Sequence, residues 1–253
     1  MLNRLEQEIG YPVLQRGSGG VSLTEAGEAL MPHVERILRD SRALEQAIAD
    51  HRPEERRILR IGSYTSISRN WLPPVLKGFG AQFPDVQLTV KDGSCMDIEQ
   101  WLMEGTIDVG LLSNCFSAPL EFLPLLQDPY YAVLPPEERP GETFDISAFN
   151  GRTFFIPSKG VDTEVLRILE RSGVTPRFSL IATEDSAVIK MVEQGLGCSL
   201  LSELILRGNM DHVSLVPIDP PAFREVGAAV RSLKKVGPVL RSFLHYIRRD
   251  AEK

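Results

Sequence analysis

Hydroxyl side chains cluster where a predicted strand gives way to a helix. Residues 59–62, LRIG, predict a buried strand, and four Ser or Thr residues fall among the next six positions, SYTSIS at 63–68. Ligands of open α/β sheets bind beyond the carboxyl ends of the strands. Hydroxyls beside the free N–H groups of a helix start suit a carboxylate, phosphate or sulfate. One capping residue explains one hydroxyl and not four, so we favour an anion-binding turn over a cap among solvated neighbours.

Four further turns follow predicted strands and are also small and polar. Lys159, in one of them, could neutralise an anionic ligand, although a loop lysine is more often simply solvated. The four turns are Asp92-Gly93-Ser94-Cys95, Ser113-Asn114, Pro157-Ser158-Lys159-Gly160 and Thr183-Glu184-Asp185.

Catalytic and metal-binding patterns are missing from the sequence. None of the four histidines (His33, His51, His212 and His245) stands beside a Ser or Cys in a nucleophile-like turn. There is no phosphate loop and no HExxH motif. We therefore expect no enzyme activity, no catalytic residues, no cofactor and no metal.

Composition and charge are those of an ordinary globular protein. The 253 residues are 43% hydrophobic and 25% charged, without the run of about 18 apolar residues that a membrane span needs. The start, MLNRLEQEIG, lacks the pattern of a signal peptide, so we expect a cytoplasmic protein with no membrane partner. The net charge of −6 argues against broad, non-specific affinity for nucleic acid.

The longest helical pattern runs from Thr24 to Asp50. Its apolar residues recur at alternating three- and four-residue steps, which places them on one stripe with a heptad period. Such a stripe favours a dimer seam, and the alternative is an amphipathic helix packed on its own domain. The stripe consists of Leu30, Val34, Ile37, Leu44 and Ile48, with Ser41 as its polar member.

The segment before this helix predicts a short helix and a hairpin. Residues 3–9 are helical in pattern, Gly10 is a plausible end and Pro12 prevents continuation. Two strand-like pieces then flank a glycine-rich turn, and Thr24 caps the long helix. The stretch LNRLEQEIGYPVLQRGSGGVSLTEAG resembles the junction of recognition helix, wing and linker helix in LysR-type transcriptional regulators. The residues that carry the resemblance are Leu5-Glu6, Gly10, Leu14, Arg16, Leu23-Thr24 and Ala26-Gly27.

From Ile58 onward the pattern alternates between strands and helices, after a polar break at 53–57. Two successive sets of such units predict two α/β lobes, each with a largely parallel sheet. The expected strands are 59–62, 86–90, 109–112, 130–134, 153–156, 178–181, 198–201, 213–216 and 226–230. The expected helices are 72–83, 96–103, 163–171, 185–194 and 238–249.

The resemblance extends over essentially the whole chain and implies a two-lobed, periplasmic-binding-protein-like α/β effector domain. It implies a winged helix-turn-helix remnant at 1–23, a linker and dimerisation helix at 24–52, and the effector domain at 57–253. The first lobe would comprise about 57–131 and 229–253, and the second about 132–228. An effector cleft between the lobes would be lined by Ser63, Thr65, Ser66, Ser158 and Thr183, with Ser94 and Asn114 as weaker candidates.

The resemblance also implies the partners: operator DNA, a small anionic effector, and a second copy of the chain in a homodimer or homotetramer. Arg4 and Arg16 are the candidate phosphate contacts, with solvated surface arginines as the alternative. Up to Arg57, eight arginines stand against ten acidic residues, and the family's first two helices have no counterpart. We therefore expect poor operator binding by this chain alone.

Two other functions stay open at this point. One is a metabolite-binding protein without DNA-binding activity, including one that acts as a dominant-negative partner of full-length regulators. The other is a small enzyme on the same fold, such as a cyclase or deaminase.

The three cysteines are Cys95, Cys115 and Cys198. Their odd number and wide spacing suggest a reducing compartment and no metal site. Some LysR-type regulators sense oxidants through paired cysteines, but this spacing does not match theirs, so we expect no redox pair. Cys198 should pack as a small apolar residue, and Cys95 lies nearest the expected cleft.

Overall fold

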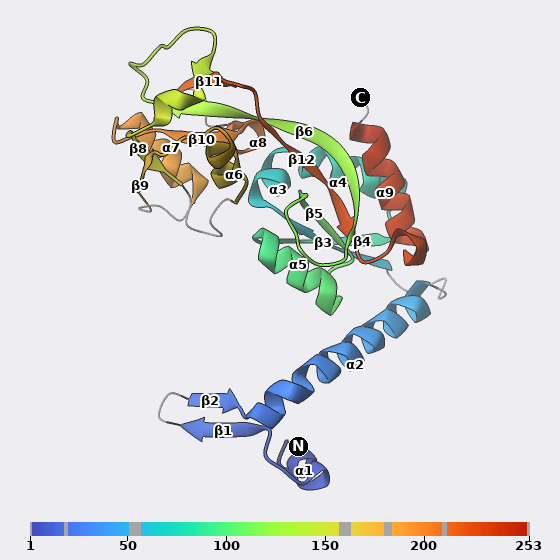
Figure 1. Ribbon diagram of the computed structural model, residues 1–253. Helices are drawn as coiled ribbons and strands as arrows, with labels where there is room; N and C mark the ends of the chain where they lie inside the picture. The colour runs from blue at the N-terminus through green and yellow to red at the C-terminus, as the bar shows by residue number, and fades with distance from the viewer. Residues whose placement is uncertain are drawn as a thin grey trace. The chain divides into compact units, whose positions relative to one another are not determined.

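A computed structural model describes residues 2–17, 20–50, 57–156, 163–179, 184–208 and 212–251 (Figure 1). The chain forms two compact units, one centred on the N-terminal 55 residues and one on the α/β domain that follows. Within the described residues, no helix is both long and apolar enough to cross a membrane.

The first unit contains helix α1 (Leu2–Ile9), a hairpin of strands β1 (Leu14–Gly17) and β2 (Gly20–Leu23), and helix α2 (Glu25–Asp50). This order confirms the predicted helix, hairpin and long helix. Gly10 ends α1 with a positive φ of 87°, a conformation that glycine adopts without strain. The Glu6 carboxylate joins α1 to the hairpin, because it accepts the N–H groups of Val13 and Leu14 at 2.8 and 3.1 Å.

Helix α2 begins with the predicted cap. The Thr24 hydroxyl accepts the N–H of Gly27 at 3.0 Å and donates to the carbonyl of Pro12 at 2.9 Å. A Cβ on Gly27 would collide with the carbonyl oxygen of Val13. Glycine at this position therefore allows the helix start to approach the hairpin closely.

The apolar stripe of α2 lies largely in solvent. Val34, Ile37 and Leu44 are 42%, 67% and 62% exposed, and Leu30 is half-buried. The side chain of Ile48 lies outside the described residues. A helix that exposes this much apolar surface is not packed as an ordinary core helix.

The first lobe of the α/β domain is built on parallel strands with helices on both faces. Strand β3 (Arg57–Ser63) lies between β4 (Val86–Asp92) and β5 (Val109–Ser113). One face packs against α3 (Thr65–Asn70), α4 (Leu72–Gln82) and α9 (Pro238–Ala251). Phe79 of α4 and Phe243 of α9 belong to the hydrophobic core that these elements share. The other face packs against α5 (Cys95–Glu104) through Ile98 and Leu102.

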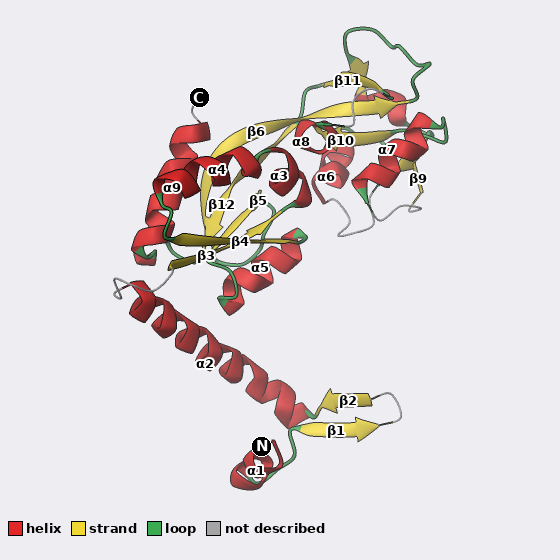
Figure 2. Cartoon of the chain, turned by 180° about the vertical axis from the view of Figure 1, so that it is seen from behind, coloured by secondary structure: helices red, strands yellow, loops and turns green. Residues whose placement is uncertain are grey.

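Two long strands join the lobes, as both views of the chain show (Figures 1 and 2). They are β6 (Glu121–Leu134) and β12 (Phe223–Val230), and they pair antiparallel to one another. Val226 and Val230 lie in the core of the first lobe, whereas Tyr130 and Leu134 lie in that of the second. The packing therefore favours lobe changes near Asp128 and Phe223, earlier than the boundaries expected at 131 and 228.

The second lobe packs its helices on both sides of β6. Alternate residues of β6 face two cores, one with Ala132 and Leu134 and one with Val133. Its other elements are β7 (Phe144–Asp145), the 3-10 helix at Ile146–Phe149, β8 (Thr153–Phe155), α6 (Thr163–Arg171), β9 (Arg177–Ser179), α7 (Asp185–Glu193), β10 (Ser199–Ser202), α8 (Glu203–Leu206) and β11 (Ser214–Asp219). A further 3-10 turn, Leu233–Lys235, precedes α9.

The α/β class and the two lobes are confirmed, but the prediction of largely parallel sheets is wrong in part. Among the described strands, β6 pairs antiparallel with β10, β11 and β12, and β12 pairs antiparallel with β5. The sheet is mixed because its two longest strands cross between lobes in opposite directions.

Candidate functional site

The turn after β3 lies where the two lobes meet. Ser63 is fully buried, and its hydroxyl donates to the carbonyl of Tyr64 at 3.1 Å. Thr65 is exposed and opens α3, and Ser66 is buried beside it. A space of only about 20 Å³ separates this helix from the second lobe, roughly room for one water. It is lined by Thr65, Ser66, Arg69 and Asn70 from the first lobe and Asp185, Ser186 and Ile205 from the second.

A buried ion pair joins the crossing strands beneath this turn. Arg224 of β12 donates to Asp128 of β6 at 2.8 Å, and the two side chains are only 5% and 1% exposed. Asp128 also accepts the N–H of Leu204 at 2.9 Å, and Arg224 donates to the Ser66 hydroxyl at 3.1 Å. Burial is the largest single influence on the pKa of Arg224 and lowers it, but Asp128, Tyr130 and Glu164 together outweigh burial and hold that pKa above its usual range. We call this set the hinge contact.

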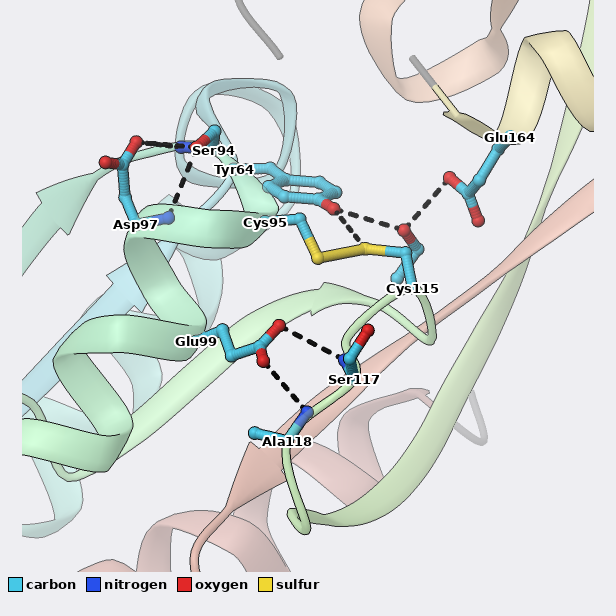
Figure 3. Close-up of a disulfide and its surroundings, with 10 residues drawn as sticks. Tyr64, Ser94, Cys95, Asp97, Glu99, Cys115, Ser117, Ala118 and Glu164 are labelled. Carbon is cyan, nitrogen blue, oxygen red and sulfur yellow. Dashed lines mark hydrogen bonds between the residues drawn. A yellow bond between two sulfur atoms is a disulfide. The ribbon is translucent and has the colours of Figure 1, made fainter. Parts of the chain in front are cut away.

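A second contact between the lobes lies nearer the surface (Figure 3). The Ser113 hydroxyl, at the end of β5, donates to the Glu164 carboxylate of α6 at 2.9 Å. The Tyr64 hydroxyl lies 3.3 Å from Ser113 Oγ and 3.0 Å from Cys115 Sγ. Ser113 is fully buried, and Glu164 is half-buried. We call the Ser113–Glu164 hydrogen bond the rim contact.

The expectation of unpaired cysteines is wrong, because Cys95 and Cys115 form a disulfide. Twenty residues separate them in sequence, but the ends of β4 and β5 bring their Cα atoms to 6.8 Å. Cys198 is free and fully buried, as predicted for a small apolar residue. Burial raises the pKa of its thiol to about 11.

The weaker candidates of the first lobe have ordinary structural surroundings. Ser94 caps α5: its N–H and hydroxyl donate to the Asp97 carboxylate at 2.9 and 2.7 Å, and its hydroxyl accepts the Asp97 N–H at 3.2 Å. Asn114 is exposed, and its N–H donates to the carbonyl of Glu225 at 3.3 Å. The structure thus brings Ser66 to the hinge contact, with Thr65 beside it, and leaves Ser94 as a cap.

Several predicted residues fall outside the described part of the chain. These are Ser158, Lys159 and Thr183 in the second lobe and, in the first unit, the side chains of Arg4 and Arg16. Within the described residues, no group of three or more His, Cys, Asp or Glu side chains could hold a metal ion.

Sequence reasoning missed four side chains that lie at or beside the two contacts between the lobes. Asp128 and Arg224 each interrupt an apolar strand, and a charged residue at such a position indicates a buried ion pair. Tyr64 stands inside the hydroxyl cluster and was not singled out. Glu164 lies in the first turn of an exposed-looking helix, and nothing in its sequence surroundings distinguishes it from a solvated residue.

A larger pocket lies beside the hinge. It measures about 220 Å³ and is lined by Trp71 of the α3–α4 junction, β6, α8 and the end of α9. Its arginine, Arg207, is already paired with Glu203 at 2.9 Å. A ligand with a negative charge would have to break that pair, so we place the candidate site between the lobes instead.

Comparison with known families gives a match over most of the chain. The model of the LysR substrate binding domain matches residues 52–252. The uncharacterized HTH-type transcriptional regulator YvbU of Bacillus subtilis (strain 168) is 24% identical over 251 residues, 96% of this chain and 85% of that protein. The probable HTH-type transcriptional regulator LrrA of Synechococcus elongatus is 27% identical over 252 residues, 98% and 85% of the two chains.

Solved structures share the fold at low sequence identity. The regulatory domain of Synechocystis PCC6803 CcmR, in complex with 2-PG, superposes with a TM-score of 0.71 at 21% identity and covers 78% of this chain and 98% of that one. CbnR, a LysR family transcriptional regulator, superposes with a TM-score of 0.72 at 18% identity and covers 100% and 88%.

Proposed function

We propose, from the premise that this chain belongs to the LysR family of transcriptional regulators, that its effector is a small anionic metabolite bound between the two lobes. Effector-binding residues would be Thr65 and Ser66. The remaining candidates are Ser63, Ser94, Asn114, Ser158 and Thr183. Domain boundaries at 1–23, 24–52 and 57–253 form part of the proposal.

One observation carries the anionic assignment. A hydroxyl of the first lobe, on Ser113, already holds a carboxylate of the second lobe, that of Glu164, across the cleft. A hydrogen bond to a carboxylate is stronger than one between neutral groups. A metabolite carboxylate or phosphate could make the same hydrogen bond and displace Glu164. The 2-PG complex of the CcmR regulatory domain lends support by analogy.

The mechanism that we propose is a shift between two lobe arrangements. The hinge contact keeps the lobes joined, while the rim contact is exchanged for a contact with the effector. A ligand shifts such a balance only by its different affinities for the two arrangements. That coupling would then change the geometry of the assembled regulator on its DNA.

A binding panel tests the effector proposal. Small carboxylates and phosphate monoesters are screened by thermal shift, and the best binder is measured by titration calorimetry. Ser66→Ala should weaken binding by about ten- to a hundredfold, since one charged hydrogen bond contributes about 1.5–3 kcal/mol. Ser68→Ala is the matched control, because Ser68 lies on the same helix and donates only to the carbonyl of Thr65. Equal losses in both variants, or no binder at all, would contradict the proposal.

We also propose a homodimer, or a dimer of dimers, joined through the stripe on α2. Leu30→Asp with Ile37→Asp would place charges in an apolar seam and should halve the sedimenting mass. Arg36→Asp is the control, because it adds a negative charge to the same helix about 120° from Leu30. Unchanged mass in the double variant would mean that the chains associate elsewhere.

Operator DNA is the proposed macromolecular partner, with Arg4 and Arg16 as phosphate contacts. Because we expect poor operator binding by this chain alone, selection from a random DNA pool uses the chain joined to the first two helices of a winged helix-turn-helix, and it should enrich a two-fold symmetric sequence, since dimers read paired half-sites. Failure to enrich any sequence would favour the alternative of a metabolite-binding protein without DNA-binding activity.

The proposal also covers where the protein is found and whether it is an enzyme. We propose a cytoplasmic protein that binds its metabolite without converting it and needs no cofactor. The relatives in the comparison are named as transcriptional regulators and not as enzymes. Mass spectrometry of the bound metabolite after overnight incubation should recover it unchanged.

A further inference from the structure

The disulfide lies beside the cleft and is half-buried. Cys95 is the first residue of α5, and Cys115 lies two residues beyond the end of β5. Both residues are half-buried and not enclosed in the core. Figure 3 shows the two sulfur atoms directly beneath the Tyr64 ring.

A chain of contacts runs from this bond to the second lobe. Cys115 Sγ lies 3.0 Å from the Tyr64 hydroxyl, which also contacts Ser113 Oγ at 3.3 Å. Ser113 in turn donates to Glu164 at 2.9 Å. Any movement of Cys115 therefore reaches the rim contact through either Tyr64 or the two-residue link to Ser113.

The loop after Cys115 has a second anchor on the same helix. The Glu99 carboxylate accepts the N–H groups of Ser117 and Ala118 at 3.2 and 2.8 Å. The start of α5 is separately held by the reciprocal hydrogen bonds of Ser94 and Asp97. Cleavage of the disulfide would therefore free the segment around Cys115 without releasing the whole loop or unwinding the helix.

We propose that Cys95 and Cys115 form a reversible thiol–disulfide modification site that controls the rim contact between Ser113 and Glu164. Two small-molecule thiols reduce the bond: their two sulfurs join in a new disulfide, and two electrons and two protons pass to Cys95 and Cys115. The reverse exchange with a small-molecule disulfide restores the bond. In the reduced protein Cys115 moves away from Cys95, Tyr64 reorients, and the rim contact weakens.

The chain contains its own control thiol. Cys198 is fully buried and unpaired, and burial raises its pKa to about 11. At pH 8 it is almost entirely protonated, and the thiol form is a poor nucleophile. Cys198 should not take part in exchange while the protein is folded.

The first experiment tests the site itself. The full chain is equilibrated in mixtures of reduced and oxidised dithiothreitol at pH 8, alkylated with iodoacetamide without denaturation, and mapped by peptide mass spectrometry. We expect alkylation of Cys95 and Cys115 together in the reduced protein, of neither after reoxidation, and of Cys198 only after unfolding. The site is excluded if Cys95 and Cys115 resist reduction in the folded protein, or are alkylated after full oxidation.

The second experiment tests the coupling to the other lobe. Hydrogen–deuterium exchange is compared in oxidised and reduced protein for peptides of α6, with peptides of α7 as an internal reference. Reduction should speed exchange in α6 at least twofold and leave α7 unchanged. The Cys95→Ser/Cys115→Ser variant should match the reduced state under both conditions.

Two variants separate coupling from a general loosening of the first lobe. In Ser113→Ala, the rim contact is already absent, so reduction should no longer change exchange in α6. Glu164→Ala removes the rim contact from the side of the second lobe, and it serves if Ser113→Ala folds poorly. A redox effect on α6 that persists in these variants, or no effect in the wild type, would overturn the proposal. Neither result depends on which metabolite the cleft binds.

Discussion

The hinge contact and the rim contact both join the lobes, and they differ in almost every physical respect. At the hinge, two charges lie 2.8 Å apart and almost fully out of solvent, with Leu204 and Ser66 completing their hydrogen bonds. At the rim, the neutral hydroxyl of Ser113 donates to a carboxylate that is only half-buried. A buried charge that loses its partner is costly, whereas a half-buried carboxylate can turn to water. We therefore expect the hinge contact to stay formed when the effector binds, and the rim contact to be exchanged for a contact with the effector.

The hinge should show the largest effect of mutation. Arg224→Met leaves the Asp128 carboxylate buried without its cation, and the free energy of unfolding should fall by about 3–5 kcal/mol. Urea denaturation, followed by circular dichroism, measures it. Arg60→Met is the matched control, because Arg60 pairs with Asp108 at 3.8 Å near the surface and should cost under about 1 kcal/mol. Similar losses in both variants would mean that the buried Arg224–Asp128 pair contributes no more to stability than the more exposed Arg60–Asp108 pair.

The rim should show a smaller effect. Ser113→Ala removes one hydrogen bond to a carboxylate, and stability should fall by about 1–2 kcal/mol. Ser117→Ala is the control from the same loop, since Ser117 is exposed and uses its backbone N–H to reach Glu99. A loss in Ser113→Ala as large as that in Arg224→Met would mean that the rim, too, is a permanent joint.

The smallest effect is expected beside the rim but outside the contact between lobes. Ser94→Ala removes the cap of α5, which should cost about 1 kcal/mol. Because Ser94 bonds only within its own helix start, the variant should leave hydrogen exchange in α6 unchanged. Faster exchange in α6 would show that Ser94 contributes to the joint between lobes.

The sequence predicts the elements of this fold well where apolar periodicity is unbroken. The helix at 163–171 has its predicted bounds, and most other elements agree within one to three residues. Strand β6 is the main exception, since only 130–134 was predicted out of Glu121–Leu134. Gln127, Asp128 and Pro129 interrupt its apolar pattern at the point where the chain crosses between lobes. Arg224 satisfies the buried acid there, and that partner lies 96 residues away in sequence.

The candidate site could be predicted only in part, because its contacts depend on the sheet order. The hydroxyl cluster at 63–68 marked the place where the lobes meet. Its partners Glu164 and Arg224 come from other elements, and their local sequence does not indicate that they converge. The disulfide was missed for the same reason. A spacing of 20 residues does not by itself indicate a pair, and the two cysteines come together only because β4 and β5 both lie beside β3 in the sheet.

The most direct test of the central claim is hydrogen–deuterium exchange with and without the tightest-binding anion from the panel. If the effector replaces the rim contact and leaves the hinge contact, exchange should change in α6 and in residues 113–118. The N–H of Leu204, which Asp128 holds, should stay equally protected. Changed protection at Leu204 with none in α6 would contradict the account, because the hinge and not the rim would then respond to the effector.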